Sequence, residues 1–206
     1  MGVAQELDSD RWDAWEPVEA ARRLAGVHAP WYVAAGWAID LFLGGKRRAH
    51  DDLEIAIPAA ALPEFVEALP GLEIYAVRVP GRGIFTPLGE AGPGLAETHQ
   101  TWVRDPASGD WKLDLFREPS EGDTWICRRD ESIRMPFSEA IRFTDDGIPY
   151  GRPEIVLLFK ARHAAQEKNQ ADFEATLPLL DSTERATLAD WISLVHPGHR
   201  WLQVLS

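Results

Sequence analysis

In the segment Asp-Leu-Glu-Ile-Ala-Ile at residues 52–57, every second residue is a branched aliphatic side chain. Successive side chains of a β-strand point to opposite faces of the sheet, so the aliphatic side chains share one face and Asp52 and Glu54 share the other. The pattern predicts a strand with one face in the core and two acids on the opposite face. Neighbouring carboxylates repel each other, so a bound cation would stabilise this arrangement.

The spacing of the two acids suits a magnesium ion. Residues two apart on a strand lie about 6.6 Å apart along the chain, with their side chains on the same face. Magnesium takes oxygen ligands, usually one or two carboxylates together with phosphate and water. Asp52 and Glu54 are therefore candidate ligands. The alternative is a solvated strand face, because an acid pair of this kind is common on strands.

A third acid occurs in a second alternating segment, Trp-Lys-Leu-Asp-Leu-Phe at residues 111–116. Asp114 lies on the face opposite the Trp and Leu side chains of this predicted strand. If the strand lies beside residues 52–57, Asp114 joins the metal cluster or accepts the proton of an attacking hydroxyl. The alternative is an exposed acid on an edge strand.

Hydrophobic periodicity and Gly or Pro positions predict the remaining elements. We expect helices at residues 16–25, 37–43, 58–69, 152–168, 173–180 and 183–194, the last starting at Ser182 as its cap, and strands at 31–34, 72–79, 98–104, 125–128 and 140–143. Residues 105–110 predict a hairpin turn, and recurrent Gly and Pro at 80–94 predict a long irregular loop over the site.

This order predicts an α/β (α+β) fold, with a mixed sheet flanked by helices and a helical C-terminal segment. The expected division is a catalytic region at residues 1–151 and a helical region at 152–206 packed on it. A chain of 206 residues is long enough to bury a substantial core.

The net charge of the chain is 21 − 33 = −12. This charge argues against broad binding to nucleic acid, which depends on basic patches, and it suits a cationic small molecule or a site that gathers metal ions. No apolar run approaches the roughly 20 residues that span a membrane. The N-terminus lacks the features of a signal peptide, so we expect a cytoplasmic protein. The one cysteine, Cys127, excludes an intrachain disulfide and a Cys-based zinc site.

Residues 33–40, Val-Ala-Ala-Gly-Trp-Ala-Ile-Asp, precede Leu43-Gly44 and then residues 48–54, Arg-Ala-His-Asp-Asp-Leu-Glu. This series resembles the antibiotic nucleotidyltransferases of the polymerase-β-like superfamily, above all the aminoglycoside 2''-adenylyltransferase and lincosamide nucleotidyltransferase branch. Those proteins carry a Gly-Gly-Trp-(Ala/Gly)-(Ile/Val)-Asp turn followed by Arg-x-His-x-Asp-(Ile/Leu)-(Asp/Glu). The likeness keeps the internal spacing, and a weaker likeness continues through Asp114 and residues 147–160.

The resemblance implies a nucleotidyltransferase fold and a Mg²⁺-dependent activity. The implied reaction moves a nucleoside monophosphate, AMP from ATP in the first instance, onto a hydroxyl of a small molecule such as an aminoglycoside-like antibiotic. An acceptor that is a protein or RNA, as in toxin-like relatives, is an alternative, and so is a catalytically silent nucleotide-binding homologue. The net charge argues against RNA, and the complete set of three acids argues against a silent protein.

The resemblance also implies roles for individual residues. Main-chain amides at the turn bind the triphosphate, helped by the N-terminus of the following helix, and the acids hold magnesium. The implied nucleotide-binding residues are Gly36, Trp37, Arg48 and Lys160, and the implied metal-binding and catalytic residues are Asp52, Glu54 and Asp114, the last as a ligand or as the base.

Asp40, His50 and Ala35 lie in the same stretch of the sequence as the predicted site residues. Asp40 either contacts the acceptor or supports the loop, through Arg48 or by hydrogen bonds, and His50 is interpreted as a structural support of the same loop. Ala35 stands where the related proteins usually carry a second glycine. Residues 80–94 would shape the acceptor pocket but align with no segment of the related proteins, so the acceptor stays open. The sequence does not indicate the oligomeric state.

Overall fold

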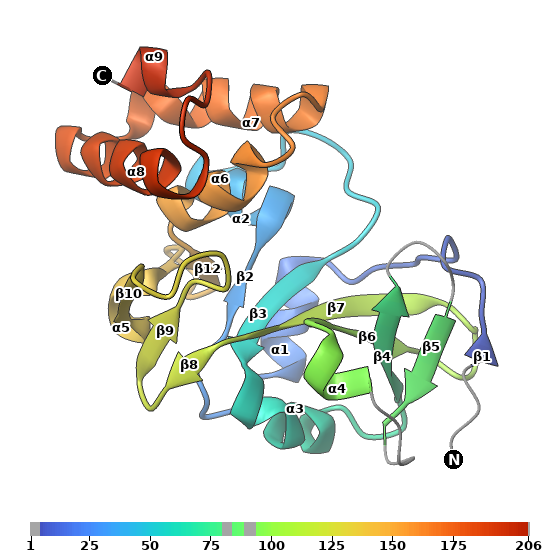
Figure 1. Cartoon of the computed structure of the whole chain (residues 1–206). Coiled ribbons are helices and arrows are strands. Elements are labelled where there is room, and N and C mark those ends of the chain that lie inside the picture. Colours follow the sequence, from blue (N-terminus) through green and yellow to red (C-terminus); the bar gives the residue numbers. More distant parts are fainter. Residues whose placement is uncertain (1–4, 80–83, 89–93, 206) are drawn as a thin grey trace.

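The structure is a computed structural model that describes residues 5–79, 84–88 and 94–205. In this part of the chain a large mixed sheet has the strand order β1-β5-β4-β6-β7-β3-β2-β12-β11, and a small sheet has the order β10-β9-β8 (Figure 1). The strands are β1 Gln5–Glu6, β2 Tyr32–Val33, β3 Glu54–Pro58, β4 Glu73–Val79, β5 Ile84–Pro87, β6 Gln100–Arg104, β7 Trp111–Glu118, β8 Ser120–Glu121, β9 Thr124–Ile126, β10 Arg134–Pro136, β11 Ile141–Phe143 and β12 Pro149–Gly151.

The centre of the large sheet is the parallel pair β3 and β7. In this pair Glu54 lies opposite Asp114 and Ile55 lies opposite Leu115. The side chains of Leu53, Ile55 and Leu115 are completely buried, as the alternating pattern predicted. The predicted hairpin is also confirmed, because β6 and β7 pair antiparallel on either side of the turn. The two segments that carry the acids are therefore neighbouring strands.

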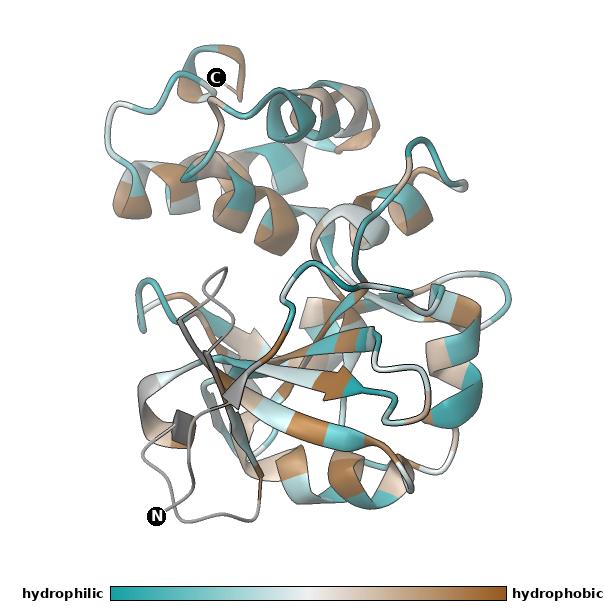
Figure 2. Ribbon diagram, turned by 90° about the vertical axis from the view of Figure 1, so that its right-hand side faces the viewer, coloured by the Kyte–Doolittle hydropathy of each residue, from teal (hydrophilic) through white to brown (hydrophobic). Residues whose placement is uncertain are grey.

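Helices cover the sheet and form a separate group at the C-terminus. They are α1 Pro17–Arg23, α2 Ala35–Phe42, α3 Leu62–Ala68, α4 Gly94–Glu97, α5 Phe137–Ala140, α6 Pro153–Ala161, α7 Glu167–Thr176, α8 Ser182–Val195 and α9 Leu202–Leu205, with short 3-10 turns at Ala59–Ala61 and Leu177–Leu179. Figure 2 shows the C-terminal helices as a layer above the end of the sheet. The α/β fold class is confirmed. None of the helices in the described ranges is long and apolar enough to cross a membrane.

The C-terminal helices differ in two places from the prediction. The helix expected at 152–168 ends at Ala161, and the helix expected at 173–180 is α7, which begins earlier, at Glu167, and ends at Thr176. The cap of α8 is Asp181 and not Ser182: its side chain accepts from the main-chain N–H of Glu184, whose carboxylate accepts in turn from the N–H of Asp181. This reciprocal pair satisfies two free N–H groups at the helix start, which explains why the cap lies one residue earlier.

One core cluster contains residues of the sheet and of α6 and α8. It includes Ile55 on β3, Leu157 and Leu158 on α6, and Ile192 on α8, all almost completely buried. The helical group is therefore packed on the sheet through shared apolar contacts. The division into regions 1–151 and 152–206 stays a prediction.

The irregular loop expected at 80–94 is wrong for residues 84–87, which form β5 and pair with both β4 and β1. Phe85 is completely buried in an aromatic cluster with Tyr75, Trp102 and Trp111. Burial of this side chain outweighs the local Gly and Pro signal. The strand lies toward the edge of the sheet, separated from β3 by β4, β6 and β7, so these residues do not cover the acids. Residues 80–83 and 89–93 lie outside the described part.

The entry into α2 carries a backbone constraint. Ala35 has φ +49°, a left-handed conformation that side chains with a Cβ rarely adopt. Ala34, directly before it, is extended with φ −113°. The left-handed conformation costs an L-residue about 1–2 kcal/mol. The position where related sequences usually carry glycine is therefore one where glycine removes a steric cost.

We expect Ala35→Gly to raise the free energy of unfolding by up to about 1 kcal/mol, because relief of the left-handed strain exceeds the extra chain entropy of glycine. The matched change Ala34→Gly relieves no strain and should lower the free energy of unfolding by about 0.5–1 kcal/mol. Urea denaturation of both variants measures the two effects. Equal destabilisation by both changes would show that Ala35 is not strained.

Candidate active site

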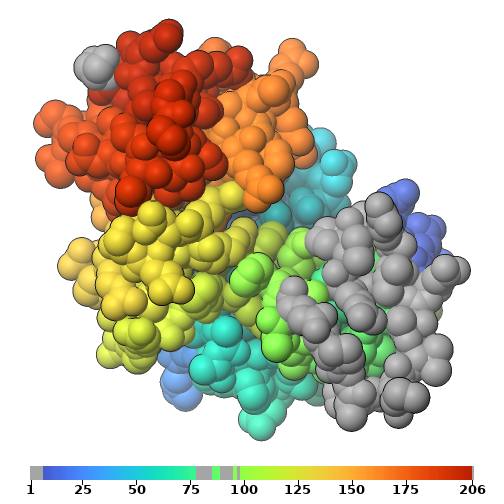
Figure 3. All heavy atoms as spheres, in the orientation of Figure 1, coloured from blue at the N-terminus to red at the C-terminus, as the bar shows by residue number. Residues whose placement is uncertain are grey.

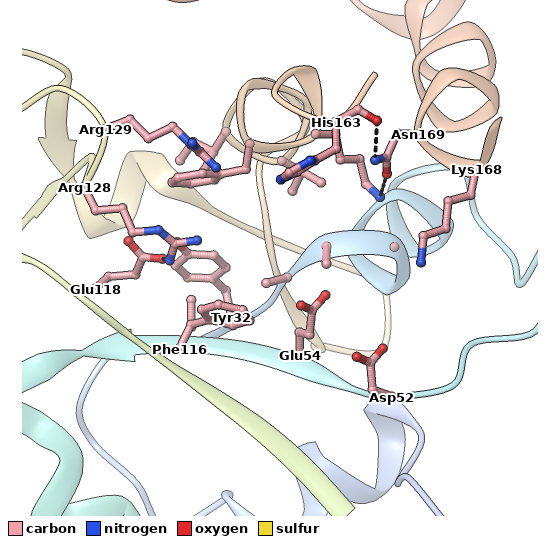
Figure 4. Close-up of a pocket in the computed structure, with 18 of the residues that line it drawn as sticks. Tyr32, Asp52, Glu54, Phe116, Glu118, Arg128, Arg129, His163, Lys168 and Asn169 are labelled. Carbon is pink, nitrogen blue, oxygen red and sulfur yellow. Dashed lines mark hydrogen bonds and ion pairs between the residues drawn. The ribbon is translucent and has the colours of Figure 1, made fainter. Parts of the chain in front are cut away.

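A cavity of about 360 Å³ opens between the start of α2, strand β3 and helices α6 and α7 (Figure 4). The predicted site residues that line it are Gly36, Arg48, Asp52, Glu54 and Lys160. They come from four separate parts of the chain, and the fold brings them to one place. Trp37, Asp40 and Asp114, which were also predicted, do not line it. The cavity is the candidate active site.

The carboxylates of Asp52 and Glu54, the predicted magnesium ligands, point into the cavity side by side, as Figure 4 shows. Burial, together with repulsion from Asp52, raises the pKa of Glu54 to about 7. Burial also raises the pKa of Asp52, although the charge of Lys168 acts against the rise. Neither carboxylate forms an ion pair with a described residue. Two half-buried, unpaired carboxylates with oxygen donors on one face fit a magnesium ion whose other ligands are phosphate and water.

Asp114 lies one strand away from this pair and is almost completely buried. Its Oδ2 accepts a 2.7 Å hydrogen bond from Gln100 Nε2, and its Oδ1 has no hydrogen-bond partner among the described residues. Burial and the nearby charge of Glu54 raise the pKa of Asp114 well above its usual range. Across the described residues no three His, Cys, Asp or Glu side chains gather as a ready metal site. The role of Asp114 as ligand or base stays a prediction.

Cationic side chains lie across the cavity from the acids. Lys160 Nζ lies 2.8 Å from Asp172 Oδ2 and donates a 3.1 Å hydrogen bond to Asn169 Oδ1. Arg48 lies 3.7 Å from the same carboxylate of Asp172. Figure 4 shows the side chain of Lys168 also directed toward the acids. Acids on one wall and cations on the other suit a metal-bound phosphate between them.

The loop between α2 and β3 is held by polar contacts that converge on Asp40. Asp40 Oδ2 accepts from the main-chain N–H of Arg47 at 3.0 Å and lies 2.8 Å from His50 Nε2. The His50 ring stacks on Trp37, with 4.4 Å between the ring centroids. Of the two roles weighed for Asp40, the contacts are those of loop support, although its partners are His50 and Arg47 and not Arg48. Trp37 likewise has its ring in the loop and can offer the cavity only its main chain.

Gly36 lies directly beneath the Arg48 side chain. A Cβ atom at position 36 would meet Arg48 Nη2 at 2.1 Å and His50 Cε1 at 2.9 Å. Since atoms cannot approach this closely, any side chain at position 36 would displace the guanidinium of Arg48. Glycine at this position therefore lets an arginine of the loop lie directly over the start of α2.

Several residues of the cavity were not singled out from the sequence. One of them is Arg128, whose guanidinium lies 5.0 Å from the centroid of the Phe116 ring and 4.5 Å from that of the Phe159 ring. Arg128 Nη1 also donates a 2.9 Å hydrogen bond to Glu118. The sequence signals at 125–128 indicate only a weak strand, so no local pattern marks this residue. Asp172, which pairs with Lys160 and Arg48, was also missed, because it lies between the helices expected at 152–168 and 173–180.

Replacement of Glu54 tests the charge repulsion at the metal pair. Because the pKa of Glu54 is raised from 4.5 to about 7, its ionisation destabilises the folded state as the pH rises through this interval, and the effect is complete above pH 7. In metal-free protein, Glu54→Gln should therefore be more stable than wild type at about pH 8, with a smaller difference at about pH 5. Urea denaturation measures the difference, with the exposed Glu67→Gln as control. A difference that is independent of pH would contradict the repulsion.

Replacement of Gly36 tests the position of Arg48. If the cavity binds MgATP, as the resemblance implies, we expect Gly36→Ala to weaken this binding by at least about tenfold, since one displaced charge-assisted contact is worth about 1.4 kcal/mol or more. Gly45→Ala is the matched control, because a Cβ at position 45 meets nothing within 4 Å. Titration calorimetry compares the two variants with wild type. Equal affinities for all three proteins would mean that Arg48 does not contact the nucleotide.

The chain is similar to known adenylyltransferases, both by a family model and by solved structures. The family model of the aminoglycoside-2''-adenylyltransferases matches residues 18–78. A search of curated proteins finds no match. The lincosamide antibiotic adenylyltransferase LnuA, in its lincomycin-bound crystal structure, is similar with a TM-score of 0.54 and 15% identity, over 79% of this chain and 95% of that chain.

Two structures of ANT(2'')-Ia are similar to the same degree. The solution structure of this antibiotic-resistance factor has a TM-score of 0.54 and 15% identity, over 86% of this chain and 89% of that chain. The crystal structure in complex with adenylyl-2''-tobramycin has a TM-score of 0.54 and 14% identity, over 84% and 92%. The family match over residues 18–78 and the shared fold confirm the resemblance predicted from the sequence: this chain is similar to the aminoglycoside and lincosamide adenylyltransferases and has their fold.

Proposed function

We propose that the enzyme transfers AMP from ATP to a hydroxyl group of a small molecule in a Mg²⁺-dependent reaction. The observation that carries the proposal is the arrangement of the cavity: Asp52 and Glu54 form one wall, and Lys160 and Arg48 lie on the other, beside the start of α2. A nucleoside triphosphate with its metal fits this distribution of charge. The enzyme would act in the cytoplasm, where ATP is available.

The acids and the cations have separate roles in this proposal. Magnesium held by Asp52 and Glu54 would neutralise phosphate oxygens and orient the α-phosphate. Lys160 and Arg48 would bind the outer phosphates, and the nucleotide would take over from Asp172 as their anionic partner. Main-chain N–H groups at Gly36 and Trp37, at the start of α2, would add hydrogen bonds to phosphate.

The transfer itself needs a group that removes a proton from the acceptor. The acceptor oxygen forms a bond to the α-phosphorus, the bond from the α-phosphorus to the bridging oxygen breaks, pyrophosphate leaves, and the hydroxyl proton passes to Asp114. The free Oδ1 of Asp114 beside Glu54 supports this role. Since Glu54 contributes to the raised pKa of Asp114, a cation at the metal pair would lower it toward the value a base requires.

The relatives support a small molecule as the acceptor. LnuA has been solved with lincomycin and ANT(2'')-Ia with an adenylylated tobramycin, both compounds of small molecular size. We propose a small hydroxyl compound as the acceptor, within a class that includes such antibiotics. The three acids are all present, which favours an active enzyme over a silent nucleotide-binding protein.

The test is release of pyrophosphate from ATP, with Mg²⁺ and a panel of hydroxyl compounds that includes aminoglycosides and lincosamides. We expect Asp52→Asn to lower turnover by about a thousandfold, because the metal supplies several kcal/mol of charge stabilisation. Asp190→Asn, an exposed change on α8, is the matched control and should keep wild-type turnover. The proposal is wrong if Asp52→Asn turns over as fast as wild type. Calorimetry with ATP and Mg²⁺ separates a silent nucleotide-binding protein from one that binds no nucleotide.

A further inference from the structure

A second cavity of about 680 Å³ adjoins the active-site cavity and shares Phe116, Arg128 and Arg129 with it. Its remaining walls include Gln100 at the start of β6 and His196 at the end of α8. Figure 3 shows this side of the molecule, where the C-terminal helices meet the segment that follows β9. None of the predicted site residues lines this second cavity, which we call the basic cavity.

The charge of the basic cavity is opposite to that of the whole chain. Its walls carry Arg128, Arg129 and Arg162 together with His99 and His196, and no Asp or Glu is found among its described lining residues. The acid partner of Arg128 is Glu118, which lines the active-site cavity instead. Among the described lining residues, therefore, no carboxylate offsets the charge of the three arginines.

Two of the arginines have no counter-ion. Arg129 and Arg162 form no ion pair with any described residue, although the protein has an excess of acids. Arg129 Nε is buried without a hydrogen-bond partner in the described structure, and so is His196 Nε2. Burial and the charges of Arg128 and Arg162 lower the pKa of Arg129. Unpaired guanidinium groups held close together are stabilised by an anion between them.

The basic cavity is connected to the proposed chemistry through one residue. Gln100 lines it, and Gln100 Nε2 donates the 2.7 Å hydrogen bond to Asp114 Oδ2. Asp114 is the acid that takes the acceptor's proton in the proposed function. A molecule in the basic cavity would therefore be separated from Asp114 by Gln100, while the nucleotide occupies the neighbouring cavity over Asp52 and Glu54. This is the place for an acceptor.

We propose that the basic cavity binds the acceptor by an anionic group, so that the acceptor is a hydroxyl compound bearing a phosphate or carboxylate and not a polycationic aminoglycoside. The inference rests on the proposed function for the identity of the bound molecule. Guanidinium groups recognise phosphate and carboxylate through paired, charge-assisted hydrogen bonds. The same groups repel ammonium groups, which gives the cavity selectivity against polyamines.

The net charge of −12 is compatible with an anionic acceptor. Charges that are separated by more than about 8 Å of salt solution are largely screened, so the groups that line a cavity decide its selectivity. The charge of the sequence favoured a cationic substrate, but the fold places three arginines at this one point. Local charge decides which small molecule is bound.

The experiment follows the imidazole signals of His99 and His196 by NMR, in protein whose active-site cavity is filled with Mg²⁺ and an ATP analogue that has a methylene bridge between its α and β phosphorus atoms. Ribose 5-phosphate and gluconate serve as anionic probes, ribose as the neutral match and tobramycin as the polycation. We expect the anionic probes to shift both signals in a saturable way, and ribose and tobramycin to leave them unchanged. If neither anionic probe shifts them, or if tobramycin does, the inference is overturned.

Variants assign the binding to the arginines. Arg162→Gln, an exposed change that leaves the fold intact, should weaken binding of the anionic probe by at least tenfold, and Arg129→Gln should do the same. The control is Arg134→Gln, which removes the same charge from an exposed side chain on β10 outside the cavity. Unchanged probe affinity in both cavity variants would contradict the assignment.

Calorimetry with the ATP analogue reports on the proposed function separately. Failure of the analogue to bind rejects the proposed nucleotide transfer but leaves the histidine titration readable. Binding of the analogue without any shift by the anionic probes rejects only the anionic acceptor.

Discussion

The parallel pairing of β3 with β7 is the contact on which the site depends. It places Glu54 directly beside Asp114 and brings Asp52 to the edge of the same cavity. The pairing is held by the opposite face of the two strands, where Leu53 and Leu113 are completely buried. Apolar burial on one face thus keeps like charges together on the other, against their repulsion. A cation is the natural partner of such an arrangement, which is why geometry and family resemblance lead to the same chemistry.

The part of the cavity that is proposed to bind phosphate is formed by main-chain groups and by close packing. Arg48 can lie over the start of α2 only because residue 36 lacks a side chain, and the loop that carries Arg48 is anchored by Asp40 and His50. Ala35 keeps a left-handed backbone at the same turn. The turn thus keeps a strained backbone at the proposed phosphate site, as is common where a site is organised before its ligand binds.

The basic cavity, the proposed acceptor site, is formed in a different way, because its lining residues come from separate segments that meet there. Arg128 and Arg129 come from the segment after β9, Arg162 from the residues after α6, and Gln100 from β6. Together they give a cationic cavity next to the acid cluster, in a protein with an excess of acids. Nucleotide and acceptor can thus be held by two neighbouring cavities of one surface, with the shared Arg128 and Phe116 between them.

The sequence by itself determined the elements whose evidence is local: the alternation of residues 52–57, the hairpin that ends in β7, and the turn at Gly36. The alternation of buried side chains along a strand and the need for glycine at a crowded turn depend on residues that are close in sequence. Such features can therefore be predicted from the sequence alone. Only the tertiary structure decided that residues 84–87 are a strand, that Asp172 balances Lys160 and Arg48, and that three arginines share a cavity. Those outcomes depend on contacts between distant segments, and no local pattern encodes which distant side chain will supply the partner.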